Sequence, residues 1–407
     1  MAEHQESFLI DKDLRPACYD DFHCLMSECR YSCCKVSWRI TFNKKDYLAL
    51  KRQNGSPDLE ARMERALRRV RKDLPAEHYG EFDMHSGECP LLREDCLCAL
   101  QVEKGHEVLP KVCQTFPRAE SYTPGYLEKS LTPACEGVLE LLWNLPEGLE
   151  FRSEPLPKEL QRTLHLQEQG LHLMYFPLIR EWCVDVLQDR RFPLPDRLLL
   201  LGLGLRRLAD GEKDYAAWLL WARALPESAE HLLDREADEH TLARFLSNNI
   251  QVLIELNVPG PDFSELKSDL LRSLNLTINR ETNRTTIPLA PYQEARKRWE
   301  SRIGERGYFM ENLMVMLALH LYFPDLTSPK ALWKSYANLC SLYSVYRFME
   351  VMSCREGAAG DKAELFRLIV YTSRGLIHNN SFQNKLRDEL FQHDSATLAH
   401  MAILLSG

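Results

Sequence analysis

Cysteines crowd into the first third of the chain, and no other feature constrains its fold as strongly. The 407-residue sequence contains 13 cysteines, and 10 of them lie between Cys18 and Cys135. Four fall within the eleven residues CLMSECRYSCC, which run from Cys24 to Cys34. Thiolates spaced this closely converge readily on one soft metal ion or on an iron–sulfur cluster. The pattern therefore predicts that this region folds around an inorganic centre.

Disulfides and ordinary buried thiols explain this crowding less well. Disulfides belong mainly to oxidising compartments and to small domains without a sufficient core. The chain opens MAEHQESFLIDKDLRP, which lacks the apolar segment of a secretory signal, so we expect a cytoplasmic protein with reduced thiols. Burial in the core is the expected role of the isolated Cys183, Cys340 and Cys354. It does not account for four cysteines within eleven positions.

The spacing leaves the kind of inorganic centre open. A structural zinc site normally shows two C-x2–4-C pairs, whereas this chain has C-x4-C-x3-C-C and then C-P-x5-C-x-C. The motif C-x3-C-x2-C is absent, since Val36 stands where its third cysteine would be, and this argues against the radical chemistry of that motif. The adjacent Cys33 and Cys34 cannot easily both bind one tetrahedral ion. One of them is therefore expected to face a second metal, a second cluster iron or the core.

The ordered motifs of this region resemble one protein family. CX4CX3CC followed by W-x-I, CPLL…LCAL, VCQTFPR and EKSLTPAC is similar to the FliB flagellin lysine-N-methylase family, and the later ERGYFMENLMVMLALHLYFPD resembles its helical part. That family is in turn similar here to small CxxCxxCC proteins that bind zinc or iron–sulfur. The resemblance implies cytoplasmic transfer of methyl groups from S-adenosylmethionine to lysine side chains of flagellin. It also implies an iron–sulfur cluster, expected to be 4Fe-4S with zinc as the alternative.

The candidate metal ligands follow from these motifs. In the related families the matching positions are the cysteines of "CP" and "C-x-L", which ranks Cys89 and Cys98 above Cys96. Cys135 is expected in the first turn of a helix that begins near Thr132-Pro133, where the partial positive charge of the helix end favours a thiolate. The predicted ligands are Cys29, Cys33, Cys34, Cys89, Cys98 and Cys113, with Cys24 and Cys135 as further candidates.

The residue pattern of the sequence changes near residue 146. Leucine-rich segments of helical length, separated by proline and glycine turns, replace the cysteine-rich loops. We therefore predict a mainly α protein in which residues 1–145 form a cysteine-rich metal or iron–sulfur region with little β structure and residues 146–407 form an α-helical domain. Within the first region, residues 58–74 are predicted to form one amphipathic helix. The glycines of LGLGL, Gly202 and Gly204, follow no predicted strand and indicate close helix packing rather than a cofactor-binding turn.

Residues 256–287 interrupt the helical pattern of the second part of the chain. They comprise a turn, a helical stretch SDLLRSLNL and a polar segment, for which a flexible loop is the simplest interpretation. Glu311 stands at the entry of the very apolar stretch Leu313 to Phe323. A carboxylate buried there must be paired, ligated or catalytic.

Charge and hydropathy exclude two classes of partner. The net charge is −8, with acidic and basic residues interspersed, whereas nucleic-acid binders show a basic bias. The longest apolar run has eleven residues, and a membrane-spanning helix needs about 20. Because no recognised S-adenosylmethionine motif appears, a second hypothesis remains open beside the methyltransferase. It is a metal-binding or iron–sulfur-binding helical interaction or assembly protein without catalytic activity.

Overall fold

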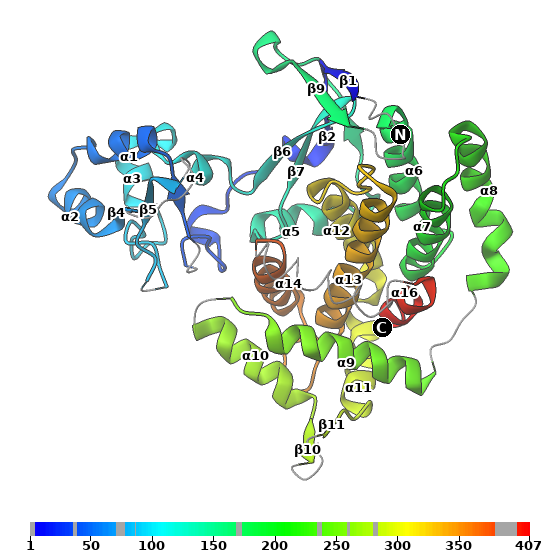
Figure 1. Cartoon of the computed structure of the whole chain (residues 1–407). Helices are drawn as coiled ribbons and strands as arrows, with labels where there is room; N and C mark the ends of the chain where they lie inside the picture. Colours follow the sequence, from blue (N-terminus) through cyan, green and yellow to red (C-terminus); the bar gives the residue numbers. More distant parts are fainter. Residues whose placement is uncertain are drawn as a thin grey trace.

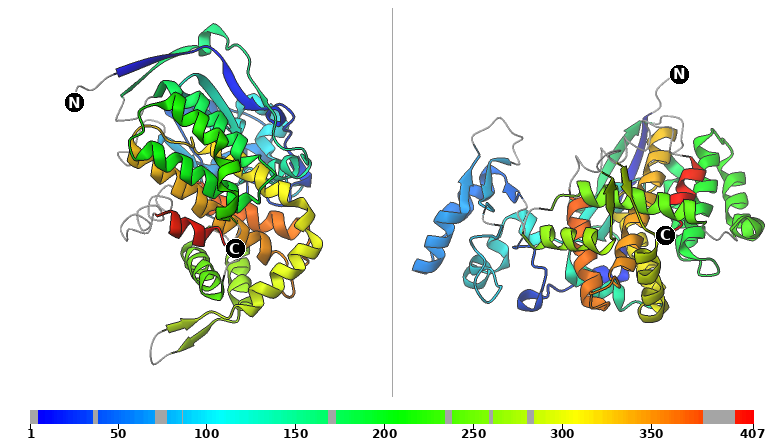
Figure 2. Two further views of the ribbon diagram at one scale, coloured as in Figure 1. Left: turned by 90° about the vertical axis from the view of Figure 1, so that its right-hand side faces the viewer. Right: turned by 90° about the horizontal axis from the view of Figure 1, so that it is seen from below.

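The computed structural model shows a mainly helical protein, which confirms the predicted fold class (Figure 1). A large helical body carries a small mixed sheet on one side, and a smaller cysteine-rich unit stands beside it (Figures 1 and 2). The structure describes residues 5–35, 39–70, 78–85, 87–167, 173–233, 238–258, 261–279, 284–378 and 397–407.

Helix α13, Pro329–Met352, forms the centre of the helical body. Ser328 begins it, because its side chain accepts a hydrogen bond from the Ala331 backbone N–H and Pro329 occupies the first turn. The helix contacts α7, α9, α11, α12, α14 and α16. The helices of the body are α6 Phe176–Leu187, α7 Leu194–Ala209, α8 Tyr215–Leu233, α9 Glu239–Glu255, α10 Pro261–Ser273, α11 Ala290–Arg302, α12 Gly307–His320, α14 Lys362–Leu376 and α16 Leu398–Leu404.

The glycines of LGLGL lie inside α7, as predicted. A Cβ on Gly202 would collide with the Tyr336 ring of α13, and one on Gly204 would collide with the Trp182 indole of α6. The Trp218 indole N–H also donates to the Gly204 carbonyl at 2.9 Å. These glycines therefore allow α7 to pack closely against neighbouring helices.

A four-stranded sheet of order β6-β7-β2-β8 covers part of the helical body. Strand β7 packs against α12, and helix α5 follows it directly in the chain. The elements are β2 Asp13–Pro16, β6 Arg118–Thr123, β7 Tyr126–Leu131, α5 Glu136–Trp143 and β8 Phe151–Arg152. Separately, β1 Gln5–Ile10 pairs antiparallel with β9 Arg162–Gln167. The polypeptide on both sides of the cysteine-rich unit thus belongs to the sheet.

The cysteine-rich unit has its own small core. Phe42, Leu50, Leu59, Met63 and Phe82 are buried together there, apart from the larger core of the body. The side chain of Asn43 begins the first helix of the unit by accepting a hydrogen bond from the Asp46 N–H. The elements of the unit are β3 Thr41–Phe42, α1 Lys44–Lys51, α2 Pro57–Ala66, β4 Leu67–Arg69, β5 Gly80–Phe82, α3 Ala99–Lys104 and α4 Lys111–Thr115.

The two larger hydrophobic cores divide the chain at points other than residue 145. Cys18, Tyr19 and Phe22 share the core of the helical body, and so do Leu131 and Val138. The separate core of the cysteine-rich unit contains only residues between Phe42 and Leu109. The unit is therefore an insertion between two segments that pack on the helices.

Two local predictions are wrong. The predicted helix over residues 58–74 ends at Ala66, because the chain becomes extended at Leu67 and β4 pairs antiparallel with β5; residues 71–74 lie outside the described residues. Residues 256–287 are also more regular than a loop. Helix α10 buries an apolar face that includes Phe263, Leu266 and Leu270, and β10 Thr277–Asn279 pairs with β11 Arg284–Thr286.

None of the helices in the described part of the chain is both long enough and apolar enough to cross a membrane.

Candidate functional site

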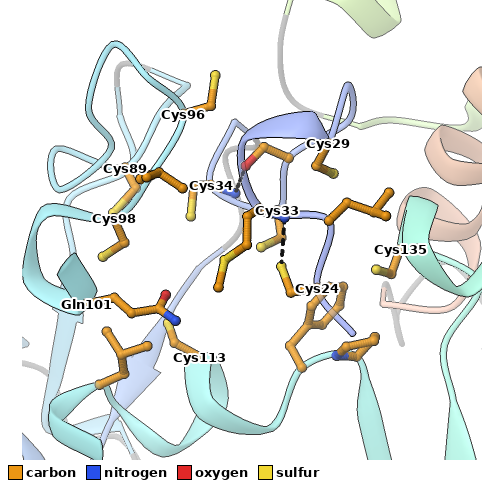
Figure 3. Close-up of a pocket in the computed structure, with 18 of the residues that line it drawn as sticks. Cys24, Cys29, Cys33, Cys34, Cys89, Cys96, Cys98, Gln101, Cys113 and Cys135 are labelled. Atoms are coloured by element: carbon orange, nitrogen blue, oxygen red, sulfur yellow. Dashed lines mark hydrogen bonds between the residues drawn. The ribbon is translucent and has the colours of Figure 1, made fainter. Parts of the chain in front are cut away.

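A pocket of about 780 Å³ lies between the cysteine-rich unit and the helical body. Figure 3 shows cysteines from several segments gathered around it, with Cys89, Cys98 and Cys113 on one side and Cys29 and Cys135 on the other. All eight predicted ligands line the pocket, and so does Cys96. The structure thus brings the candidates together, while their role as metal ligands stays a prediction. All thirteen cysteines of the chain are free thiols.

A tight turn shapes the first cysteine segment. Met26 adopts a positive φ of 53°, and its backbone N–H points to the Cys24 sulfur at 3.5 Å, as the dashed line in Figure 3 shows. A short 3-10 helix, η2 Met26–Glu28, follows, and Cys29 ends it. The turn therefore directs both Cys24 and Cys29 toward the same cavity.

Glu136 fixes this segment to the helical body. Its carboxylate accepts the backbone N–H groups of Arg30 and Tyr31 at 2.7 and 3.2 Å, and the Arg30 Nε donates to it at 2.6 Å. Glu136 is buried and is the first residue of α5, directly after Cys135. These bonds hold Cys29 close to Cys135, although the two are far apart in the sequence.

Cys135 differs from its prediction in position and in protonation. It occupies the position just before α5 rather than the first turn of the helix. Burial raises the pKa of its thiol to about 12, even though the backbone N–H of Val138 favours the thiolate. Desolvation of a charge in this pocket therefore outweighs the helix end.

The cysteine-rich unit supplies the opposite wall of the pocket. The Cys89 N–H donates to the Cys34 carbonyl at 2.8 Å, which joins the first cysteine segment to the second. An isolated β-bridge between Leu92 and Cys98 closes the intervening loop, so Cys89 and Cys98 lie near each other. Cys98 precedes α3, and Cys113 lies within α4.

Burial keeps most of these thiols protonated when no metal is bound. It is the main cause that raises the pKa of Cys29 and Cys89 to about 12, and it also raises the pKa of Cys98 and Cys113. Cys33 is the exception. A hydrogen bond from the Cys34 thiol lowers its pKa to about 7, and the pKa of Cys34 rises in turn. Metal binding would have to displace the other protons.

The donor atoms that line the pocket can be compared with the ligands that zinc ions and iron–sulfur clusters require. Within the residues that the structure describes, no three His, Cys, Asp or Glu side chains are placed to hold a single metal ion. A zinc ion needs four ligands within about 2.3 Å of one point, whereas an iron–sulfur cluster distributes its thiolates over several irons. The described lining also contains many thiols and no carboxylate. Thiols without carboxylates are the donor set of both structural zinc sites and iron–sulfur clusters.

Arg118 and Glu311 have structural partners. Arg118 donates to the Phe22 carbonyl at 3.0 Å and lies over the Phe22 ring, and both contacts are structural. The buried Glu311 accepts hydrogen bonds from Arg190 at 2.9 Å and from Arg197 at 2.6 Å. Its charge is thus paired, and nothing in these contacts requires a catalytic role.

No pattern in the sequence points to Arg374, a charged residue of the pocket. Arg374, in α14, lines the cavity although it lies more than 230 residues after Cys135. It is buried among apolar neighbours in the sequence LIVYTSRGLI, which reads as an ordinary core helix. No spacing rule could connect it to the cysteines.

Comparisons with known proteins concern mainly the helical part of the chain. The family described as "FliB lysine N-methylase C-terminal domain" matches residues 180–404. A "Lysine-N-methylase" of Salmonella choleraesuis is 32% identical over 178 residues, which cover 40% of this chain and 41% of that protein. A "Lysine-N-methylase" of Salmonella typhimurium is 31% identical over the same shares.

A shorter relative is covered more completely. The "Flagellar biosynthetic protein FliU" of Salmonella muenchen is 32% identical over 145 residues, which cover 33% of this chain and 78% of that protein. By contrast, the chain spans about two fifths of the length of the two lysine methylases that it matches. No solved structure matches the chain significantly.

Proposed function

Because the chain belongs to the FliB lysine N-methylase family, we propose that it is a protein-lysine N-methyltransferase. It would transfer methyl groups from S-adenosylmethionine to lysine side chains of flagellin. The observation that carries this proposal is the family match over residues 180–404, and the names of the similar proteins support the activity and the flagellar substrate. A cytoplasmic location is part of the proposal, since thirteen free thiols suit a reducing compartment.

The proposal places a 4Fe-4S cluster in the thiol pocket. Its ligands would come from the six predicted cysteines, which all line the pocket: Cys29, Cys33, Cys34, Cys89, Cys98 and Cys113. The nine cysteines of the pocket lining support a thiolate-bound centre. Such a cluster supplies one-electron chemistry and soft metal ligation when it is bound.

The pocket also suits a lysine side chain. Met26, Val102 and Val112 line it and are exposed by 49, 50 and 41%, so they would contact the aliphatic part of a lysine that enters from solvent. Free lysine has a pKa of about 10.4 and is protonated at neutral pH. Burial among apolar groups, without a carboxylate in the described lining, favours the neutral amine. The lysine would therefore release its proton to water before it is fully buried.

The transfer itself is a substitution at carbon. The lone pair of the neutral lysine Nζ forms the new C–N bond, the C–S bond of the sulfonium breaks, and its electron pair remains on sulfur as a thioether. The chain contributes by removing water and by aligning nitrogen, carbon and sulfur. The volume of about 780 Å³ lies within the usual range of small-molecule sites, about 300–1,000 Å³.

Labelled methyl transfer tests the proposal. The protein, purified without oxygen, would be incubated with methyl-labelled S-adenosylmethionine and flagellin. Label is expected on flagellin and not on flagellin whose lysines were first dimethylated chemically. Iron content and absorbance would be measured on the same sample.

An iron-loaded protein that transfers no label would reject the methyltransferase. That outcome would favour the alternative of an iron–sulfur-binding interaction or assembly protein.

A further inference from the structure

Gln101 presents its side-chain amide to the thiol pocket. It belongs to α3, and it lines the pocket together with its chain neighbours Cys98 and Val102. These three residues have the i, i+3, i+4 spacing of one helix face, so the segment turns one side toward the cavity. Figure 3 shows the Gln101 side chain extending from its helix into the pocket. The cysteine-rich unit therefore contributes a neutral hydrogen-bonding group to the wall of the pocket.

The other polar side chains of this wall already form hydrogen bonds within the protein. The Gln114 amide donates to the Leu109 carbonyl at 2.7 Å, and the Ser32 hydroxyl accepts the Cys34 N–H at 3.2 Å. The remaining buried or half-buried polar side chains of the described lining, thiols aside, are also bonded: Tyr31, Arg118 and Arg374. The half-buried Gln101 amide has no such partner among the described residues. It can therefore bond to a molecule that enters the pocket.

Gln101 lies directly behind an apolar entrance to the pocket. Val102, its neighbour in the chain, is 50% exposed, and Val112 of α4 is 41% exposed. Both valines line the pocket, whereas Gln101 and Cys113, which adjoin them in the chain, are only half-buried. An extended lysine side chain that enters along the two valines would carry its Nζ toward the Gln101 amide.

A neutral acceptor suits an amine that has to react as a nucleophile. A carboxylate at this position would raise the pKa of the lysine and hold it as an ammonium ion, which has no lone pair. The described lining of the pocket contains no carboxylate. The carbonyl oxygen of the Gln101 amide can accept one N–H of the neutral amine, and the lone pair of Nζ then remains free to attack a methyl group.

We propose that the Gln101 side-chain oxygen accepts a hydrogen bond from the substrate amine, orients it for methyl transfer and supports no more than two transfers to one lysine. The inference rests on the proposed function. In each transfer the C–N bond forms, the C–S bond of S-adenosylmethionine breaks with its electron pair left on sulfur, and the resulting ammonium releases one proton to water. Lysine and monomethyllysine still offer an N–H to Gln101 when neutral, whereas neutral dimethyllysine has none.

Three variants separate hydrogen bonding from structure. Gln101→Leu removes the acceptor at similar volume, and Gln101→Glu keeps the shape of the side chain but adds a negative charge. Gln53→Leu is the matched control, because Gln53 belongs to the same unit, does not line the pocket and donates to the Ala49 carbonyl at 3.4 Å. Circular dichroism and thermal denaturation of the full-length variants verify that each is folded.

The measurements are kcat and KM for flagellin at neutral pH, and the methylation state of its lysines by mass spectrometry. Gln101→Leu is expected to lower kcat about tenfold, the effect of losing one hydrogen bond, with a smaller change in KM. Gln101→Glu is expected to lower kcat and KM together, because its carboxylate binds the unreactive ammonium form. Gln53→Leu should match the wild type, and the wild type should form no trimethyllysine.

The outcomes separate this inference from the proposed function. A wild-type protein that transfers no methyl group would reject the proposed function itself. An active wild type whose Gln101→Leu variant has the kcat of Gln53→Leu would overturn the role of Gln101 alone. If the Leu and Glu variants lose kcat with the same KM, the role of Gln101 is only structural and the inference is overturned. Trimethyllysine formed by the wild type would overturn the limit of two transfers.

Discussion

Arg180 of α6 and Glu128 of β7 form an ion pair with an Nη2–Oε2 distance of 2.6 Å, although their side chains are only 3% and 2% exposed. Arg180 also donates to the Ala318 carbonyl of α12 at 2.7 Å. The pair therefore joins strand β7, which precedes residue 145 in the chain, to helices α6 and α12, which follow it. Its partners keep each other's charge compensated in a dry environment.

Removing one partner should destabilise the protein strongly. Arg180→Met leaves the Glu128 carboxylate buried without its ion pair, and we expect the free energy of unfolding to fall by about 3–5 kcal/mol. Urea denaturation measures this change. Lys297→Ala is the control, because its pair with Glu294 is exposed by 71 and 55%, and it should cost less than about 1 kcal/mol. Equal losses in both variants would contradict the prediction.

Gly204→Ala tests the close packing of α7. The added Cβ would overlap the Trp182 ring, whose indole N–H is fixed by a 3.1 Å bond to the Ala222 carbonyl. Overpacking of this kind costs about 1–3 kcal/mol, which thermal denaturation would detect. Gly307→Ala at the start of α12 is the matched control, since a Cβ there meets nothing within 4 Å. The contact would be unimportant if both variants melted at the wild-type temperature.

His320 should make stability depend on pH. Burial, and then the nearby charge of His378, lowers its pKa from 6.5 to about 4. Between these values the unfolded chain binds the proton and the folded protein does not, so stability falls as pH falls from 6.5 to 4. The loss from His320 is up to about 3 kcal/mol, and stability is independent of this group above pH 6.5.

His320→Gln removes this titration while its amide can still bond to Ser130, which lies 3.2 Å from the His320 Nδ1. In urea denaturation at several pH values, the free energy of unfolding of this variant should fall less as the pH is lowered from 6.5 to 4. His85→Gln, at a side chain that is 94% exposed, should retain the wild-type slope. An unchanged slope in His320→Gln would show that the imidazole is not kept neutral by the fold.

Individual thiols should differ in their importance for iron binding. Cys98→Ser and Cys113→Ser are expected to lose most of the bound iron and its visible absorbance, because a serine hydroxyl is a poorer ligand for iron than a thiolate. Cys96→Ser is the control, since it lines the same pocket but matches no predicted ligand position. Full iron content in all three variants, measured after anaerobic purification, would exclude these thiols as ligands.

The sequence by itself predicted those features of the structure that depend on the local residue pattern. The crowded cysteines marked the part of the chain that forms the pocket, and nine of the ten line it. The apolar spacing around Gly202 and Gly204 predicted a packed helix, and the structure confirms it. The predicted helix at Cys135 was displaced by only a few residues.

Only the tertiary structure decided which distant groups meet. Helix α2 ends at Ala66 because β5 offers Leu67 a strand partner, and that partner is supplied by residues outside the helix pattern. Glu311 is paired because Arg190 and Arg197 reach it from other segments. Arg374 enters the thiol pocket because Tyr31 docks on α14. These contacts arise from packing between segments far apart in the chain, and periodicity and spacing carry no information about such contacts.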